Sequence, residues 1–125
     1  MPSRQLARLA CLFLLLAVAA GAFGAHGLRR LLAPEQISVW QTAVLYQFVH
    51  GLGMLALAAL DSLRPSPWLR RASVFMAVGI VLFSGSLYLL SFLPMPWLGP
   101  VTPIGGAAFL AGWAAAIVGL KPSTN

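Results

Sequence analysis

The sequence predicts an all-α fold, an integral membrane four-helix bundle, and three observations support this prediction. The chain of 125 residues is 60% hydrophobic and only 8% charged, whereas soluble domains average about 25% charged residues. It contains four apolar runs that approach or exceed the length of about 17 residues needed to cross a bilayer. The basic residues lie at the ends of these runs and not on one face, which indicates membrane orientation and argues against a nucleic-acid partner.

The apolar runs predict one transmembrane domain, residues 1–125, with spans at about 6–25, 38–60, 72–93 and 103–120. The first run follows Arg4 and could instead be a signal peptide, with a basic start and small residues near its end. A retained helix is favoured because Ala17, Gly21 and Ala25 recur every four residues, a spacing that lets another helix approach closely. Cys11 is the single cysteine, so the chain forms no internal disulfide.

The second span carries an unusual set of polar residues on one helical stripe. Pro34 and Glu35 suit its first turn. The stripe consists of Gln36, Trp40, Ala43, Gln47, His50, Gly51 and Met54. It is expected to face other helices, because an unpaired polar group facing lipid is costly. His50 is expected near the membrane midplane, roughly 15 to 18 Å from either end of the span at about 1.5 Å per residue.

The last two spans show similar patterns. Ser66 is a plausible N-cap of the third span, and Pro67 follows as its first helical residue. Further along, Ser84, Tyr88 and Ser91 fall on one face, while Thr102 and Pro103 suit the start of the fourth span. A second close-packing row consists of Ala108, Gly112 and Ala116.

The distribution of basic residues predicts the orientation. With four spans, both termini and the second loop share one side, which carries six of the eight basic residues: Arg4, Arg8, Arg64, Arg70, Arg71 and Lys121. This asymmetry predicts a multi-pass protein of the cell (inner) membrane with both termini in the cytoplasm. The outer half would then hold His26, Gln36, Gln41, Tyr88, Ser91 and Thr102, which suggests a polar vestibule narrowing toward Gln47 and His50.

Four stretches of the chain carry a resemblance to a known family. They read GAFGAHGL, WQTAVLYQFVHGLGML, LFSGSLYLL and TPIGGAAFLAGW, and they cover the chain from Gly21 to Trp113. The chain resembles the domain-of-unknown-function 423 family of small four-span membrane proteins, which are similar to animal transmembrane protein 256. The resemblance implies a four-helix integral membrane protein and brings no established activity. The family's motif residues fall here on Gly21, Gly24, His26, Tyr46, Gln47, His50, Ser84, Gly85, Ser86, Tyr88, Thr102, Pro103, Gly105 and Gly106.

Two groups of candidate residues follow from the spans and motifs. The candidate polar site consists of His26, Gln47, His50, Ser84, Tyr88 and Thr102, and the candidate packing residues are Gly21, Gly24, Gly85, Gly105, Gly106 and Gly112. His50 could handle protons or bind a ligand, or it could be a neutral histidine that hydrogen-bonds across a helix interface. The other polar side chains could likewise cross-link helices. His26 and His50 are separated by much of half a bilayer and no third ligand is evident, so we expect no metal site. Haem ligation by the two histidines is conceivable, but a four-helix haem site usually has histidines at similar depth, so we expect no cofactor.

The sequence contains no catalytic motif, so we do not expect an enzyme. Its two carboxylates, Glu35 and Asp61, lie at opposite ends of the second span and cannot act as a general acid/base pair. The favoured hypothesis is an accessory or assembly protein that binds other membrane helices in the lipid bilayer, as a homo-oligomer or with a partner membrane protein. The alternative is an oligomeric channel or transporter for a small solute or ion, built on an outward-facing polar vestibule around His50. A membrane enzyme or redox protein ranks last.

Overall fold

The computed structural model describes residues 1–122 and contains no strand within them. The long helices are α1 (Ser3–His26), α2 (Pro34–Leu63), α3 (Pro67–Gly79), α4 (Gly85–Phe92) and α5 (Val101–Gly119). One π-helical segment, η2 (Ile80–Ser84), joins α3 to α4, and two short 3-10 turns, η1 (Leu28–Arg30) and η3 (Pro96–Leu98), lie in the loops. Within the described part of the chain, four continuous helices are long and apolar enough to span a membrane. The prediction of an all-α, four-span membrane protein is therefore confirmed.

The helices extend beyond the apolar runs that define the predicted spans. The clearest case is α2, whose 30 residues correspond to a length of about 45 Å, whereas the hydrocarbon core is about 30 Å thick. Its first turn contains Pro34 and Glu35, as the sequence suggests, and the Ala33 backbone N–H donates to Gln36 Oε1 at 2.9 Å. Gln36 therefore caps a helix end.

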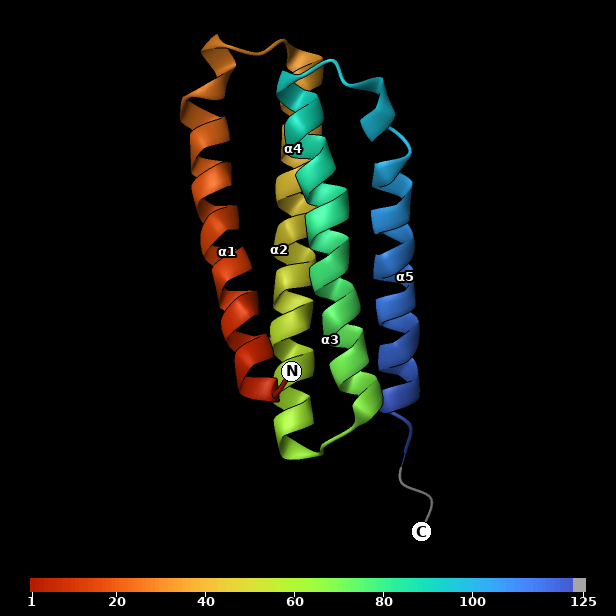
Figure 1. Ribbon diagram of the computed structural model, residues 1–125. Helices are drawn as coiled ribbons and strands as arrows, with labels where there is room; N and C mark the ends of the chain where they lie inside the picture. Colours follow the sequence, from red (N-terminus) through yellow and green to blue (C-terminus); the bar gives the residue numbers. More distant parts are fainter. Residues whose placement is uncertain (123–125) are drawn as a thin grey trace.

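The helices run alternately up and down, so that the start of α1 and the end of α5 lie at the same end of the molecule, which we call the terminal end (Figure 1). Helix α2 and the continuous third helix (α3, η2 and α4) form the central pair. Helix α1 packs on α2, and α5 packs on α3 and η2, so that α1 and α5 lie on opposite sides of this pair. The outer helices consequently expose much of their apolar surface, including Leu15 on α1 and Leu110 on α5.

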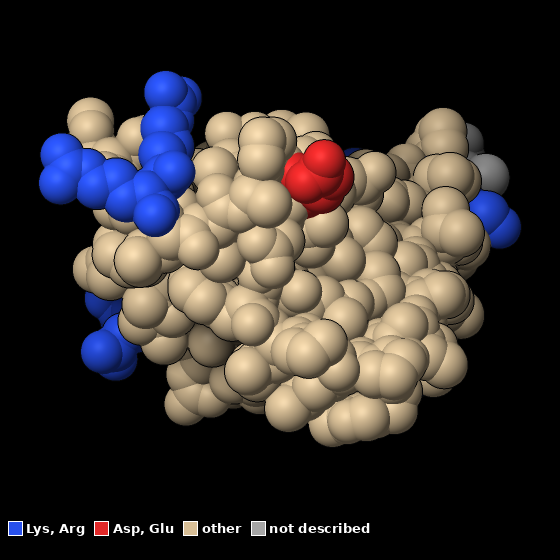
Figure 2. Space-filling view, turned by 90° about the horizontal axis from the view of Figure 1, so that it is seen from above, with Lys and Arg blue, Asp and Glu red and all other residues tan. Residues whose placement is uncertain are grey.

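The interior has two layers. The half in which α1 starts and α5 ends has a mainly apolar core, in which the buried side chains include Leu6, Met54, Leu57, Leu69 and Met76, although Asp61 and Ser73 are also buried there. The half nearest the first and third loops holds most of the other buried or half-buried polar side chains, among them Gln47, Ser84 and Tyr88. Seen from above, the surface is mostly uncharged, with one acidic group in red and basic side chains toward the edges of the view (Figure 2).

The π-helical segment brings the third helix very close to α5. A Cβ atom added to Gly105 would lie 2.3 Å from the Phe83 backbone nitrogen, so only glycine fits there. Opposite this contact, Ser84 Oγ donates to the Ala43 carbonyl of α2 at 2.8 Å. A π turn inside an α-helix is frequently found at a functional site, and here it lies between α2 and α5.

The candidate packing glycines differ in how closely they are approached. A Cβ at Gly24 would lie 2.7 Å from the Trp40 ring, and one at Gly112 would lie 3.0 Å from Met76 Cε, so both positions are tight. Added Cβ atoms at Gly21 and Gly106 would make only ordinary contacts, at 3.4 and 3.9 Å. A Cβ at Gly85 would meet no heavy atom within 4 Å, so Gly85 is not a close-packing residue and its assignment to that group is corrected.

Candidate functional site

Gln47 links three helices inside the loop-end half of the molecule. Its side chain is only 4% exposed. Its Nε2 donates to the Phe13 carbonyl of α1 at 2.7 Å, and its Oε1 accepts the Tyr88 hydroxyl of α4 at 2.5 Å. An amide on α2 with partners on both flanking helices satisfies its polar atoms without water, as a low-dielectric interior requires.

Trp40 extends this connection toward the first loop. Its indole Nε1 donates to the Ala20 carbonyl of α1 at 2.9 Å. Its ring meets the Tyr88 ring edge to face, with centroids 4.6 Å apart. Trp40 therefore fixes the position of the tyrosine that bonds Gln47, and the close approach at Gly24 is to this same indole.

His50 lies one turn further along α2 and faces α5. Its Nδ1 is 2.9 Å from the Tyr46 carbonyl oxygen of its own helix. Because a carbonyl oxygen only accepts, Nδ1 carries the hydrogen of that bond and Nε2 carries the free lone pair of the neutral ring. The imidazole stacks on the Phe109 ring with centroids 3.6 Å apart and planes 11° apart.

An open groove runs beside His50 between α2 and α5, and we call it the α2–α5 groove. Its volume is about 550 Å³. The residues that line it are Tyr46, His50, Phe83, Pro103, Gly106, Ala107, Phe109, Leu110 and Trp113. Aromatic rings form one part of the lining, and the small side chains of α5 form another. The groove therefore has one histidine and one tyrosine in an otherwise apolar surface.

The remaining candidate polar residues make separate contacts. The Thr102 hydroxyl lies 2.6 Å from the Ser86 hydroxyl, which joins the start of α5 to α4. Ser84 bonds to α2 as described above, whereas Ser91 donates to the Leu87 carbonyl of its own helix. His26 is exposed at the end of α1 and takes no part in these contacts. Throughout residues 1–122, no buried side-chain nitrogen or oxygen lacks a hydrogen-bond partner.

Of the six candidate polar residues, only Gln47 and Tyr88 are hydrogen-bonded to each other. No group of three histidine, cysteine or acidic side chains suited to a metal ion occurs within the described residues. His50 belongs to the aromatic surface of the α2–α5 groove, and its neighbours there are Phe109 and Trp113.

Sequence reasoning missed a polar cluster at the terminal end of the molecule, around Asp61. This carboxylate is 1% exposed and accepts hydrogen bonds from the Ser3 hydroxyl and from the Ser66 backbone N–H, the latter at 2.7 Å. It also pairs with Arg70 at 3.4 Å. Asp61 thereby connects the start of α1, the end of α2 and the start of α3. One feature of the sequence could have pointed to this cluster: Asp61 is the sole acidic residue among the six basic residues expected on that side of the membrane.

Comparison with known families decides where the chain belongs. The family described as "Protein of unknown function (DUF423)" matches residues 20–106. The chain belongs to the DUF423 family. That match covers the whole of α2, α3, η2 and α4 and reaches the groove residue Gly106 on α5. The resemblance seen in the sequence motifs is therefore confirmed.

Several bacterial relatives of this DUF423 chain have been named. The UPF0382 inner membrane protein YgdD of Escherichia coli is 47% identical, over 82% of this chain and 78% of its own length. The UPF0382 membrane protein YwdK of Bacillus subtilis is 46% identical, over 83% and 85% respectively. A UPF0382 membrane protein of Staphylococcus saprophyticus is 42% identical, over 84% and 87%. No solved structure matches the chain. The chain is therefore a membrane protein of an uncharacterised family.

Proposed function

We propose that this chain is an accessory or assembly protein of the cell (inner) membrane, which binds a transmembrane helix of a partner membrane protein in the α2–α5 groove. The observation that carries the proposal is the lining of this groove. Gly106 has no side chain and Ala107 has only a methyl group, so a helix backbone can approach there, and the rings of Phe109 and Trp113 offer a broad contact surface.

The position of the groove supports the same proposal. It lies on the side of the bundle, between two membrane-spanning helices, and residues such as Ala107 and Leu110 are exposed along it. A partner helix in the lipid can reach this surface without opening the bundle. Gln47 is already bonded to α1 and α4, so the protein's own polar contacts need not break when the groove is filled.

An oligomeric channel around His50 draws less support from the geometry. A water-filled path would be expected to retain polar side chains that bond only to water. Gln47, Ser84 and Tyr88 instead bond to atoms of neighbouring helices. The groove beside His50 is lined mainly by aromatic and aliphatic side chains, which suit a helix surface better than a hydrated ion.

The test is photocrosslinking in native membranes. A photoreactive amino acid replaces Ala107 in the groove, and the control position is Leu15, which is 63% exposed on the outer side of α1. We expect one discrete protein adduct from position 107, identified by mass spectrometry as a single membrane partner, and none of that mass from position 15. The variant Gly106→Leu should reduce the adduct, because its side chain fills the groove. A Cβ there makes only an ordinary contact at 3.9 Å, so the fold should tolerate the change.

Two outcomes would contradict the proposal. The first is the same set of adducts from both positions. The second is an adduct at position 107 that contains only a second copy of this chain, which would favour a homo-oligomer over an accessory role.

A further inference from the structure

Among the described residues, the terminal end, where α1 starts and α5 ends, carries more basic side chains than acidic ones. Six of the eight basic residues belong to this end. The sole ion pair within residues 1–122 joins Arg70 to Asp61. Arg64 and Lys121 therefore have no carboxylate partner in the described structure, although they are exposed at the ends of α2 and α5.

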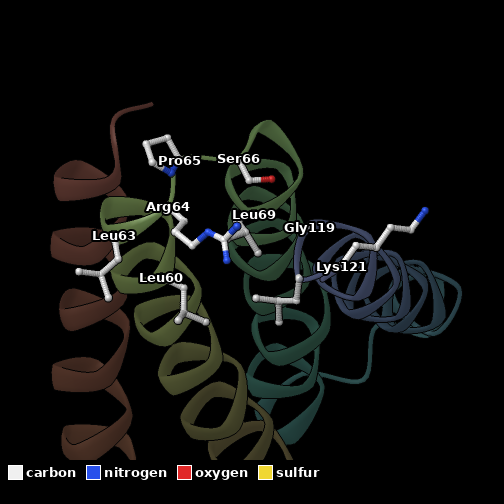
Figure 3. A pocket seen from close by; sticks show the side chains of 9 residues that line it. Leu60, Leu63, Arg64, Pro65, Ser66, Leu69, Gly119 and Lys121 are labelled. Carbon is white, nitrogen blue, oxygen red and sulfur yellow. The ribbon is translucent and has the colours of Figure 1, made fainter. Parts of the chain in front are cut away.

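Arg64 and Lys121 border one pocket, which lies between the ends of α2, α3 and α5. Its volume is about 280 Å³, and its lining consists of Leu60, Leu63, Arg64, Pro65, Ser66, Leu69, Gly119, Leu120 and Lys121. Figure 3 shows the Arg64 side chain extending into this space toward Leu69, whereas the Lys121 side chain starts on the α5 side of the pocket and points outward from it. We call it the terminal basic pocket.

The terminal basic pocket combines a basic rim with apolar walls. Leu69 is buried, and a Cβ at Gly119 would lie 2.8 Å from Leu69 Cδ2, so α5 and α3 are in close contact beneath the pocket. By contrast, Leu60, Leu63 and Leu120 are 40%, 79% and 52% exposed. These leucines continue the apolar surface of the spanning helices up to the two cationic groups. The Ser66 hydroxyl also lines the pocket and does not cap α3.

We propose that the terminal basic pocket binds the headgroup of an anionic phospholipid. The phosphate would pair with the Arg64 guanidinium, which extends into the pocket, and with the Lys121 ammonium after that flexible side chain turns toward it. Neither cation has a carboxylate partner among residues 1–122. The acyl chains would lie along Leu60, Leu63 and Leu120. Basic pockets between membrane helices suit such headgroups, and a basic residue near a membrane surface strengthens binding of an acidic lipid by about fivefold.

The apolar walls favour a lipid over a free anion. Inorganic phosphate would pair with the two cations but would make no contact with the exposed leucines. A phospholipid covers both kinds of surface at once. The ligand is thus a phosphate ester attached to hydrocarbon chains, and the pocket should distinguish it from both phosphate alone and a zwitterionic lipid.

Native mass spectrometry of the full chain in detergent tests this inference. The protein is mixed with equal amounts of phosphatidylglycerol and phosphatidylcholine, and bound lipids are counted. We expect one phosphatidylglycerol to be retained preferentially. In the double variant Arg64→Gln/Lys121→Gln, the ratio of bound phosphatidylglycerol to bound phosphatidylcholine should fall by about 25-fold, because each lost charge lowers it by about fivefold. The matched control, Arg4→Gln/Arg8→Gln, removes two charges from the same end but outside the pocket, and it should retain the preference.

Any one of three results would overturn the inference. An equal loss in the control variant would mean a general charge effect. Equal retention of phosphatidylcholine would mean that the pocket recognises only hydrocarbon. Displacement of the lipid by an equal concentration of inorganic phosphate would mean a free-anion site. The melting temperatures of both double variants are compared with that of the unmodified chain to show that each variant folds. A further variant, Arg64→Lys, retains the charge and should therefore preserve lipid binding.

Discussion

Tyr88 and Gln47 form the shortest side-chain contact between the central helices in the loop-end half, with the Tyr88 hydroxyl 2.5 Å from Gln47 Oε1. The contact joins α4 to α2 where no charged group is available. Since Gln47 also bonds to the Phe13 carbonyl, one amide holds α1, α2 and α4 together. The polar residues of this half therefore act first as connections between helices.

A double-mutant cycle measures that connection. Tyr88→Phe should destabilise the fold by about 1 kcal/mol, because it removes one hydrogen bond within the membrane and preserves the ring contact with Trp40. Gln47→Leu should cost more, since it also loses the bond to Phe13. The double variant should cost less than the sum of the two, as measured by thermal unfolding in detergent. Strict additivity would show that the two side chains do not interact.

A pair of glycine substitutions tests the close approach of η2 to α5. Gly105→Ala should destabilise the protein by about 1 to 3 kcal/mol, because its Cβ would overlap the Phe83 backbone nitrogen. Gly85→Ala should be neutral or slightly stabilising, because a Cβ there meets open space. Thermal unfolding of both variants in the same detergent compares them directly. Equal effects would contradict the packing described here.

Substitutions around Asp61 test the cluster at the terminal end. Asp61→Ala should destabilise the fold by about 1 to 3 kcal/mol, since it removes the acceptor of three contacts and leaves the Ser3 hydroxyl without its partner. Arg70→Ala should have a smaller effect, because that side chain is 40% exposed and pairs at 3.4 Å. The melting temperatures of the two variants show which substitution destabilises the fold more. A larger loss for Arg70→Ala would mean that the ion pair, and not the hydrogen bonding, stabilises this end.

Cysteine labelling tests the proposed orientation, with both termini in the cytoplasm. In a Cys11→Ser background, Leu31→Cys places a thiol at an exposed position in the first loop, and Pro122→Cys places one after α5. In intact spheroplasts, an impermeant maleimide should label position 31 at once and position 122 only after lysis. Labelling of position 122 in intact spheroplasts, with position 31 labelled only after lysis, would show that Arg29 and Arg30 determine the orientation.

The four spanning helices could be predicted from the sequence because a backbone in lipid has no water to hydrogen-bond with. Any spanning segment must satisfy its own hydrogen bonds, so the lengths of the apolar runs predict helices directly. The π turn at Ile80–Ser84 left no such trace. The π turn itself consists of four apolar residues and one serine, so no break in the polar pattern marks it in the sequence.

The candidate site was harder to anticipate for a related reason. The polar stripe placed Gln47 and His50 on one face of the second span, and both side chains are buried. The pattern does not encode the rotation of neighbouring apolar helices, so it could not show that Gln47 meets α1 and α4 while His50 stacks on Phe109 of α5. Asp61 was overlooked because a lone carboxylate at the end of an apolar run resembles an ordinary loop charge.

The central claim is that the α2–α5 groove holds a helix of another membrane protein. The most direct measurement is the ratio of protein adduct to lipid adduct formed by a photoreactive residue at position 107, compared with the same ratio at position 15, in native membranes. We predict a ratio at least tenfold higher at position 107, with one partner in the adduct and a marked decrease in Gly106→Leu. Equal ratios at the two positions, unaffected by Gly106→Leu, would show that lipid fills the groove and would contradict the claim.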